Sequence, residues 1–214
     1  MAPPVCTCPS PESHARRTVV LTGGPGAGKT AVLEVIRRQL CRHTVVLPES
    51  AGIVYQGGFP RRPSEHARRA AQLAIFHVQV QLERMALGEG SPALVLCDRG
   101  VLDGLAYWPG DEASFFAEAG ITREAALARY DAVIHLRTPG GDGGYNHQNP
   151  LRTETPAEAA AIDARLVDAW RGHPRREEVA STADFMDKLH TTLALLRREL
   201  PACCRPVRAP AAPR

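Results

Sequence analysis

Lysine is nearly missing from this chain of 214 residues: only two of its 26 basic residues are lysines, Lys29 and Lys188. Aromatic residues make up 5% of the sequence. No apolar run approaches the roughly 18 residues that a membrane-spanning helix needs. The formal net charge of +3 is too small to indicate a nucleic-acid partner by itself. We therefore expect neither a membrane protein nor a nucleic-acid-binding protein.

The N-terminal segment MAPPVCTCPSPESHARR is rich in proline and serine. It lacks the apolar stretch of a secretory signal, so we expect a cytoplasmic protein. Residues 1–15 and 201–214 are expected to be disordered tails, because both segments are proline-rich and poor in large apolar residues. Residues 16–200 are long enough to form one domain with a sizeable core.

The six cysteines do not follow the C-x-x-C spacing of common zinc sites. Cys6 and Cys8 are separated by one residue, and Cys203 and Cys204 are adjacent. We expect these four to be free thiols in a reducing compartment. Cys97 lies within an apolar run and is expected to be a small buried hydrophobic residue.

The stretch LTGGPGAGKT, residues 21–30, matches the pattern G-x-x-x-x-G-K-[ST]. Apolar and β-branched residues precede it, and the helix-forming sequence AVLEVIRRQL follows it. A strand, loop and helix in this order form a cradle whose backbone N–H groups bind phosphates. Lys29 is expected to reach the β- and γ-phosphates, and the Thr30 hydroxyl to bind Mg²⁺. The predicted nucleotide contacts are Gly23, Gly24, Pro25, Gly26, Ala27, Gly28, Lys29 and Thr30.

Apolar strands and helices alternate along the chain, which predicts an α/β fold with a mostly parallel sheet covered on both faces. Strands are expected at residues 16–23, 43–50, 93–100 and 131–138, with a weak fifth strand near 177–181. Helices are expected at residues 31–40, 64–87, from 155 onward, and at 183–199, and residues 51–63 are expected to be a loop. Thr155, Pro156 and Glu158 form the capping pattern of a helix start.

Two acidic residues follow predicted strands. Asp98 ends the third strand, and Glu49 ends the second, which is expected to lie close to the first. Ligands of such sheets bind beside the carboxyl ends of the strands. If a phosphoryl group is transferred here, Asp98 is expected to hold Mg²⁺ or to position the acceptor molecule, and Arg99 to neutralise phosphate charge. Glu49 is expected to orient or deprotonate the hydroxyl group of that acceptor. The alternatives are a surface turn for Asp98 and a helix-capping or solvated acid for Glu49.

The long predicted helix carries Gln72, Phe76, Gln79 and Glu83 on one face. This stripe either lines an acceptor pocket or is solvated.

A glycine-rich loop after the fourth strand is a candidate lid over the nucleotide. Arg137, Arg152, Arg165 and Arg171 lie on or near it. Arg152 and Arg165 are the preferred pair to neutralise charge in the transition state.

Together these motifs resemble the small P-loop AAA-type family that includes bacterial ribosylnicotinamide kinase domains and related eukaryotic nucleotide-binding proteins. Deoxynucleoside and thymidylate kinases are similar at a greater distance. The matching segments are GGPGAGKT, LPES, CDRGVLDGLAYW, VIHLRTP and NPLRTETP, with the pair Gln79-x-x-x-Glu83. The resemblance implies a P-loop NTPase fold in three layers, with a five-stranded sheet of the nucleoside-kinase type. It also implies that Glu49 activates the acceptor hydroxyl, that Asp98 and Arg99 form an acid–arginine pair, and that Asp103 and Tyr107 face the acceptor.

The leading hypothesis is an ATP- and Mg²⁺-dependent kinase of a small hydroxylated acceptor of nucleoside-like type, with GTP as the alternative nucleotide. A second hypothesis is a nucleotide-binding regulatory or switch protein without transfer activity, although the sequence has neither N-K-x-D nor D-x-x-G. A third is an oligomeric motor ATPase, which ranks last because Asp98 is followed by arginine rather than by a second acid.

Overall fold

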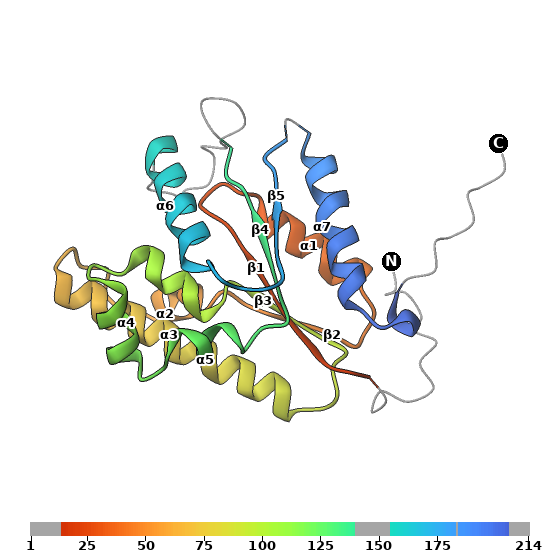
Figure 1. Cartoon of the computed structure of the whole chain (residues 1–214), viewed down its shortest axis with the longest axis horizontal. Coiled ribbons are helices and arrows are strands. Elements are labelled where there is room, and N and C mark those ends of the chain that lie inside the picture. The colour runs from red at the N-terminus through yellow and green to blue at the C-terminus, as the bar shows by residue number, and fades with distance from the viewer. Residues whose placement is uncertain (1–13, 140–154, 183, 206–214) are drawn as a thin grey trace.

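The computed structural model describes residues 14–139, 155–182 and 184–205. At its centre is a sheet of five strands with the order β2-β3-β1-β4-β5, and every pairing is parallel (Figure 1). The strands are β1 (Arg17–Thr22), β2 (Thr44–Leu47), β3 (Leu94–Asp98), β4 (Ala132–Leu136) and β5 (Arg176–Val179). The predicted parallel sheet is confirmed, and its weak fifth strand is present.

Helices cover both faces of the sheet and give the three predicted layers (Figure 1). One face packs against α1 (Lys29–Gln39) and α7 (Phe185–Glu199). The other packs against α3 (Glu65–Gly88), α4 (Glu112–Ala119), α5 (Arg123–Leu127), the 3₁₀ helix η2 (Val101–Tyr107) and the end of α6 (Pro156–Ala169).

The two apolar cores follow from the alternation of side chains along a strand. In β1, Val19 and Leu21 point into the core beneath α1 and α7, whereas Val20 points into the opposite core with Trp170. All four side chains are fully buried. A strand buried on both faces is apolar along its whole length, which explains its sequence.

Two helix starts follow the capping residues seen in the sequence. Ser64 accepts a hydrogen bond from the backbone of Ala67 at the start of α3. At the start of α6, Thr155 and Glu158 form the reciprocal capping box, with Pro156 at the first helical position. Both predicted helices are confirmed.

The prediction of a loop over residues 51–63 is wrong for its first part, which forms the helix α2 (Ser50–Gln56). Gly52 and the β-branched Ile53 and Val54 weaken the helical signal of this short segment. Packing against α3 holds α2 in place, with Val54 buried. Tertiary contact therefore overrides a weak local preference.

The domain boundary predicted at residue 200 also needs correction. The 3₁₀ helix η3 (Ala202–Cys204) follows α7, and Cys204 is buried in the core that contains Leu196 and Leu200. The packed chain therefore continues to Cys204.

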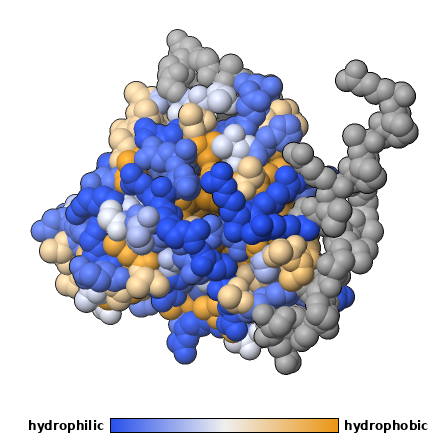
Figure 2. All heavy atoms as spheres, turned by 45° about the vertical axis from the view of Figure 1, so that its right-hand side comes forward, coloured by the Kyte–Doolittle hydropathy of each residue, from blue (hydrophilic) through white to orange (hydrophobic). Residues whose placement is uncertain are grey.

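None of the helices in the described part of the chain is long and apolar enough to cross a bilayer. On the face shown in Figure 2, hydrophilic residues surround separate and smaller hydrophobic areas.

Candidate functional site

The candidate site lies at the carboxyl edge of the sheet. Strand β1 lies between β3 and β4. The strands β2 and β3 are added on one side of β1, and β4 and β5 on the other. In such sheets this switch point opens a crevice that binds ligands. Leu21 of β1 is level with Asp98 of β3, so the P-loop (residues 23–30) begins beside that acid.

The P-loop backbone requires its glycines. Gly23 has a φ of 140°, and a Cβ atom there would lie 2.1 Å from the backbone oxygen of Leu136. Gly26 and Gly28 also have positive φ values, of 79° and 89°. The following helix α1 starts at Lys29 and has no acidic side chain in its first turn. Its N-terminal N–H groups and dipole therefore favour an anion.

Lys29 folds back over the loop. Its Nζ donates hydrogen bonds to the carbonyl oxygens of Gly23 at 2.6 Å and Gly24 at 3.2 Å. Burial, aided by the positive charge of Arg99, lowers the pKa of Lys29 to about 8, although Asp98 and other nearby acids oppose this shift. Burial thus disfavours the charged form of Lys29, and a phosphate bound beside the ammonium group would stabilise that charged form.

Asp98, the predicted cation ligand, is the last residue of β3 at this edge of the sheet. Its Oδ1 is buried and has no hydrogen-bond partner within the described residues. Burial raises the pKa of Asp98 to about 6, despite the opposing charge of Lys29. A buried carboxylate oxygen without a partner suits a hard divalent cation such as Mg²⁺. Thr30, in the first turn of α1, is exposed and leaves its hydroxyl available for the same ion.

Arg99 connects three parts of the site. Its Nε donates to Glu49 Oε1 at 2.5 Å, and its Nη1 donates to Asp103 Oδ2 at 3.1 Å and to the carbonyl oxygen of Gly23 at 3.4 Å. Burial opposes its charge, but Tyr107, Glu49 and Asp103 outweigh burial and raise the pKa of Arg99 above its ordinary value. One guanidinium thus fixes the ends of β2 and β3 relative to the P-loop.

Glu49 lies at the site although the arrangement of its strand differs from the prediction. Strand β2 pairs with β3 and not with β1, so the prediction that the first two strands are close neighbours is wrong. Glu49 lies just beyond β2, and its side chain is 40% exposed while bonded to Arg99. Burial raises its pKa, but Arg99 and Lys29 outweigh burial, so the pKa of Glu49 lies below its ordinary value. Glu49 is therefore ionised at neutral pH and open to a ligand.

Asp103 does not have the open position that contact with an acceptor requires. It is 3% exposed, and its Oδ1 accepts a hydrogen bond from Trp170 Nε1 at 2.7 Å. Its Oδ2 accepts one from the Thr22 hydroxyl at 2.7 Å and another from Arg99. Both oxygens are engaged within the protein, so Asp103 positions Arg99.

The other two predicted acceptor contacts differ from each other. Tyr107 ends η2, and the centroid of its half-buried ring lies 5.9 Å from the guanidinium carbon of Arg99. Gln79 is buried and donates to Glu83 Oε1 at 2.9 Å. Tyr130 donates to the same oxygen and accepts from the backbone N–H of Val101.

The hydrogen bond from Gln79 to Glu83 thus makes Gln79 part of a network that joins α3 to the segment after β3. Of the two sequence alternatives for this helix face, the solvated stripe is wrong, because Gln79 and Glu83 are buried. Gln72 and Phe76 on the same face are buried as well.

The predicted lid arginines are only partly described. Arg152 lies outside the described residues. Arg165 is exposed on α6. Arg137 is ion-paired with Asp163 and Glu178, so it contributes to the packing of the fold.

Three buried residues that sequence reasoning missed support the P-loop. Asp163 Oδ1 accepts hydrogen bonds from the backbone N–H of Gly24 at 3.1 Å and from His135 Nε2 at 2.8 Å. Lys188 Nζ donates to the carbonyl oxygen of Ala27 at 3.0 Å. Two of these residues stand out in the sequence. Asp163 interrupts the apolar stripe of α6, and Lys188 is one of only two lysines.

The comparisons with known proteins agree with this geometry. A family model described as an AAA domain matches residues 18–188. Comparison with curated protein sequences gave no match.

Two solved structures share the fold. The structure of deoxyadenosine kinase from M. mycoides with bound dATP matches with a TM-score of 0.57 and 11% identity, over 85% of this chain and 99% of that chain. Thymidylate kinase from Candida albicans matches with a TM-score of 0.56 and 12% identity, over 86% of this chain and 91% of that chain.

Proposed function

Because the chain belongs to the AAA-domain family of P-loop proteins, we propose that it is an ATP- and Mg²⁺-dependent phosphotransferase. It transfers the γ-phosphate to a hydroxyl group of a small acceptor of nucleoside-like type. One observation carries the proposal: the ionised carboxylate of Glu49 is held by Arg99 at the edge of the sheet where the P-loop lysine lies.

The P-loop is the proposed site of the nucleotide phosphates. Its N–H groups and the start of α1 bind the phosphate oxygens, and Lys29 exchanges its two bonds to loop carbonyls for bonds to phosphate. Asp98 and Thr30 would hold Mg²⁺, which when bound neutralises charge on the β- and γ-phosphates. The buried Oδ1 of Asp98, which has no hydrogen-bond partner among the residues that the structure describes, supports this assignment.

Glu49 is the proposed group that orients the acceptor. An ionised carboxylate accepts a hydrogen bond from the attacking hydroxyl and can receive its proton as the phosphoryl group is transferred. Phosphoryl transfer depends mainly on position and charge, so fixing Glu49 through Arg99 matters as much as its basicity. Arg99 also supplies positive charge close to the transferred group.

The nucleoside-like acceptor rests on the two kinases of similar fold, whose names refer to a deoxynucleoside and to thymidylate. In this chain Tyr107 lies beside Arg99 and offers an aromatic ring on which a base could stack.

The test is to incubate the full chain with Mg²⁺ and ATP, or GTP, against a panel of nucleosides, ribosylnicotinamide and other hydroxylated metabolites. Phosphorylated product is followed by mass. The proposal expects at least one acceptor to gain a phosphate in a Mg²⁺-dependent reaction. Tight nucleotide binding with no product from any acceptor would instead favour a nucleotide-binding regulatory protein.

A further inference from the structure

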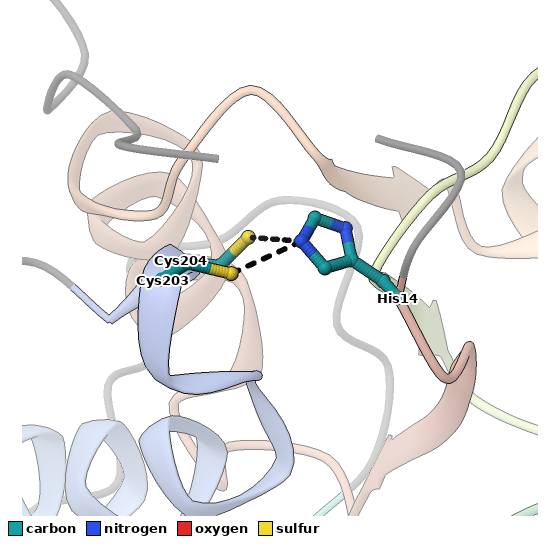
Figure 3. A group of neighbouring side chains, drawn as sticks. All are labelled: His14, Cys203 and Cys204. Atoms are coloured by element: carbon teal, nitrogen blue, oxygen red, sulfur yellow. Dashed lines mark hydrogen bonds between the residues drawn. The ribbon is translucent and has the colours of Figure 1, made fainter. Parts of the chain in front are cut away.

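Five histidine and cysteine side chains gather at the amino edge of the sheet, opposite the P-loop. They come from three segments far apart in the sequence. His14 precedes β1, Cys41 and His43 lie between α1 and β2, and Cys203 and Cys204 belong to η3. Figure 3 shows His14 with both sulfur atoms of the cysteine pair directed toward its ring.

The distances within this cluster are those of ligands that share one ion. His14 Nε2 lies 3.1 Å from Cys203 Sγ and 3.8 Å from Cys204 Sγ, and Cys204 Sγ lies 3.6 Å from His43 Nδ1. Tetrahedral Zn²⁺, with bonds of about 2.3 Å to sulfur and about 2.05 Å to nitrogen, separates such ligand atoms by about 3.6 Å. The observed distances scatter around that value.

Two overlapping triplets can be drawn, and Cys204 belongs to both. In the triplet of His14, Cys203 and Cys204, and in that of Cys41, His43 and Cys204, the ligand atoms all lie within 4.8 Å of one another. The rings of His14 and His43 are 5.4 Å apart between centroids, so the triplets form one group.

We propose that this group, called here the His–Cys cluster, binds one Zn²⁺ ion per chain. Thiolate and imidazole ligands select Zn²⁺ over hard cations such as Mg²⁺. A structural zinc site needs four ligands. Each triplet supplies three, and Cys204, which belongs to both, brings the ligands of the other triplet next to them. Cys41 and Cys204 are 4% and 1% exposed, so the ion would be shielded from water. This corrects the expectation that the paired C-terminal cysteines are ordinary free thiols.

The position of the cluster assigns the ion a structural role. His14 and His43 precede β1 and β2, whereas the P-loop follows β1 and Asp98 is the last residue of β3. The ion would join the N-terminal entry to the sheet, the first crossover connection and the turn after the last helix. Cross-linking three such segments stabilises the folded chain without contact with the nucleotide.

The test uses the purified full chain, handled with a phosphine reductant, which keeps thiols reduced. Metal content is measured by elemental analysis, Zn²⁺ affinity by competition with a coloured chelator, and coordination by the visible spectrum of added Co²⁺. The proposal expects one zinc per chain, a thiolate-type Co²⁺ spectrum, and a melting temperature that rises by several degrees with Zn²⁺.

Substitutions in the His–Cys cluster test whether the ion binds there. Cys204→Ser removes the residue shared by both triplets and should abolish stoichiometric binding and the Zn²⁺-dependent rise. Because Cys204 is buried, His43→Asn serves as a second variant at a half-buried side chain. Cys97→Ala and His190→Ala are matched controls, since one removes a cysteine from the opposite core and the other an exposed histidine.

Two outcomes would overturn the proposal. The first is wild-type protein that neither retains zinc nor shifts its melting temperature, which would leave the contacts as thiol–imidazole hydrogen bonds. The second is zinc binding that survives both Cys204→Ser and His43→Asn, which would place the ion elsewhere.

Discussion

At the scale of single residues, Arg99 has the most unusual backbone. Its φ of 72° lies in the left-handed region, and it is the one non-glycine residue with positive φ among the described residues. This conformation costs about 1–2 kcal/mol for a residue with a side chain. The bonds to Glu49, Asp103 and Gly23 hold it in place. Strain of this kind is typical of functional sites, where it directs a side chain.

Replacing Glu49 separates transfer from nucleotide binding. Glu49→Gln keeps the shape but loses the charge, so we expect phosphoryl transfer to fall by about a hundredfold or more, the range for loss of a general base. ATP affinity should stay within a factor of about three, because the P-loop is untouched. Product formation by mass and binding calorimetry give the two quantities.

The matched control is Glu34→Gln, since Glu34 is an exposed acid on α1 whose ion pair within the described residues is with the neighbouring Arg37. It should change neither quantity. Transfer at the wild-type rate in Glu49→Gln would remove Glu49 from its proposed role.

The raised pKa of Asp98 makes stability depend on pH in a predictable direction. Folding raises this pKa from 3.8 to about 6, so between these values the folded protein binds more protons than the unfolded chain. Without Mg²⁺, the contribution of Asp98 to stability therefore falls as pH rises from about 4 to about 6. Mg²⁺ needs the ionised carboxylate, so its stabilising effect should grow over the same range.

Thermal unfolding from about pH 4.5 to pH 7, with and without Mg²⁺-ATP, measures how the stability of the protein and the stabilising effect of Mg²⁺ change with pH. Subtracting the curves of Asp98→Asn, which cannot titrate, isolates the contribution of Asp98. If the difference between the two proteins is the same at every pH, the assignment is wrong.

At the scale of elements, α6 and α7 support the P-loop from outside. Asp163 on α6 accepts from the backbone of Gly24, and Lys188 on α7 donates to the carbonyl oxygens of Ala27 and Arg137. Both supports come from far along the sequence, so the motif itself gives no sign of them. Both lysines of the chain thus contact the P-loop backbone.

Lys188→Met tests this support, because it keeps the length of the side chain and removes its donor. The carbonyl oxygens of Ala27, in a buried bond, and of Arg137, in a partly buried one, lose this donor, which should cost about 1–3 kcal/mol of unfolding free energy. A loosened P-loop should also weaken ATP binding. Denaturant unfolding and calorimetry measure the two effects.

Lys188→Arg is the companion variant, because it keeps a charged donor and should lose less. Unchanged stability and unchanged ATP affinity in Lys188→Met would show that α7 does not support the loop.

Elements with strong local signals could be predicted from the sequence, and those that depend on tertiary contact could not. The capping box at Thr155 fixes the start of α6, and Ser64 fixes that of α3. In contrast, α2 carries no comparable signal and forms by packing on α3. The place of β2 beyond β3 is also a long-range property that periodicity does not encode.

At the scale of the whole molecule, the two edges of the sheet have different chemistry. The carboxyl edge gathers Lys29, Asp98, Arg99 and Glu49, each of which a motif or a strand end made predictable. The amino edge gathers the His–Cys cluster, whose members come from three segments without a metal-binding spacing. Only the folded chain brings the latter together, which is why the sequence predicted ordinary thiols there.

The proposed function depends first on the binding of a nucleoside triphosphate by the P-loop through Lys29. The most direct measurement is calorimetric titration of Mg²⁺-ATP into wild-type protein and into Lys29→Ala. We predict saturable binding by the wild type and an affinity at least about thirtyfold weaker in the variant, since a buried charge pair is worth about 2–5 kcal/mol. Equal binding and turnover by the two proteins would contradict the account.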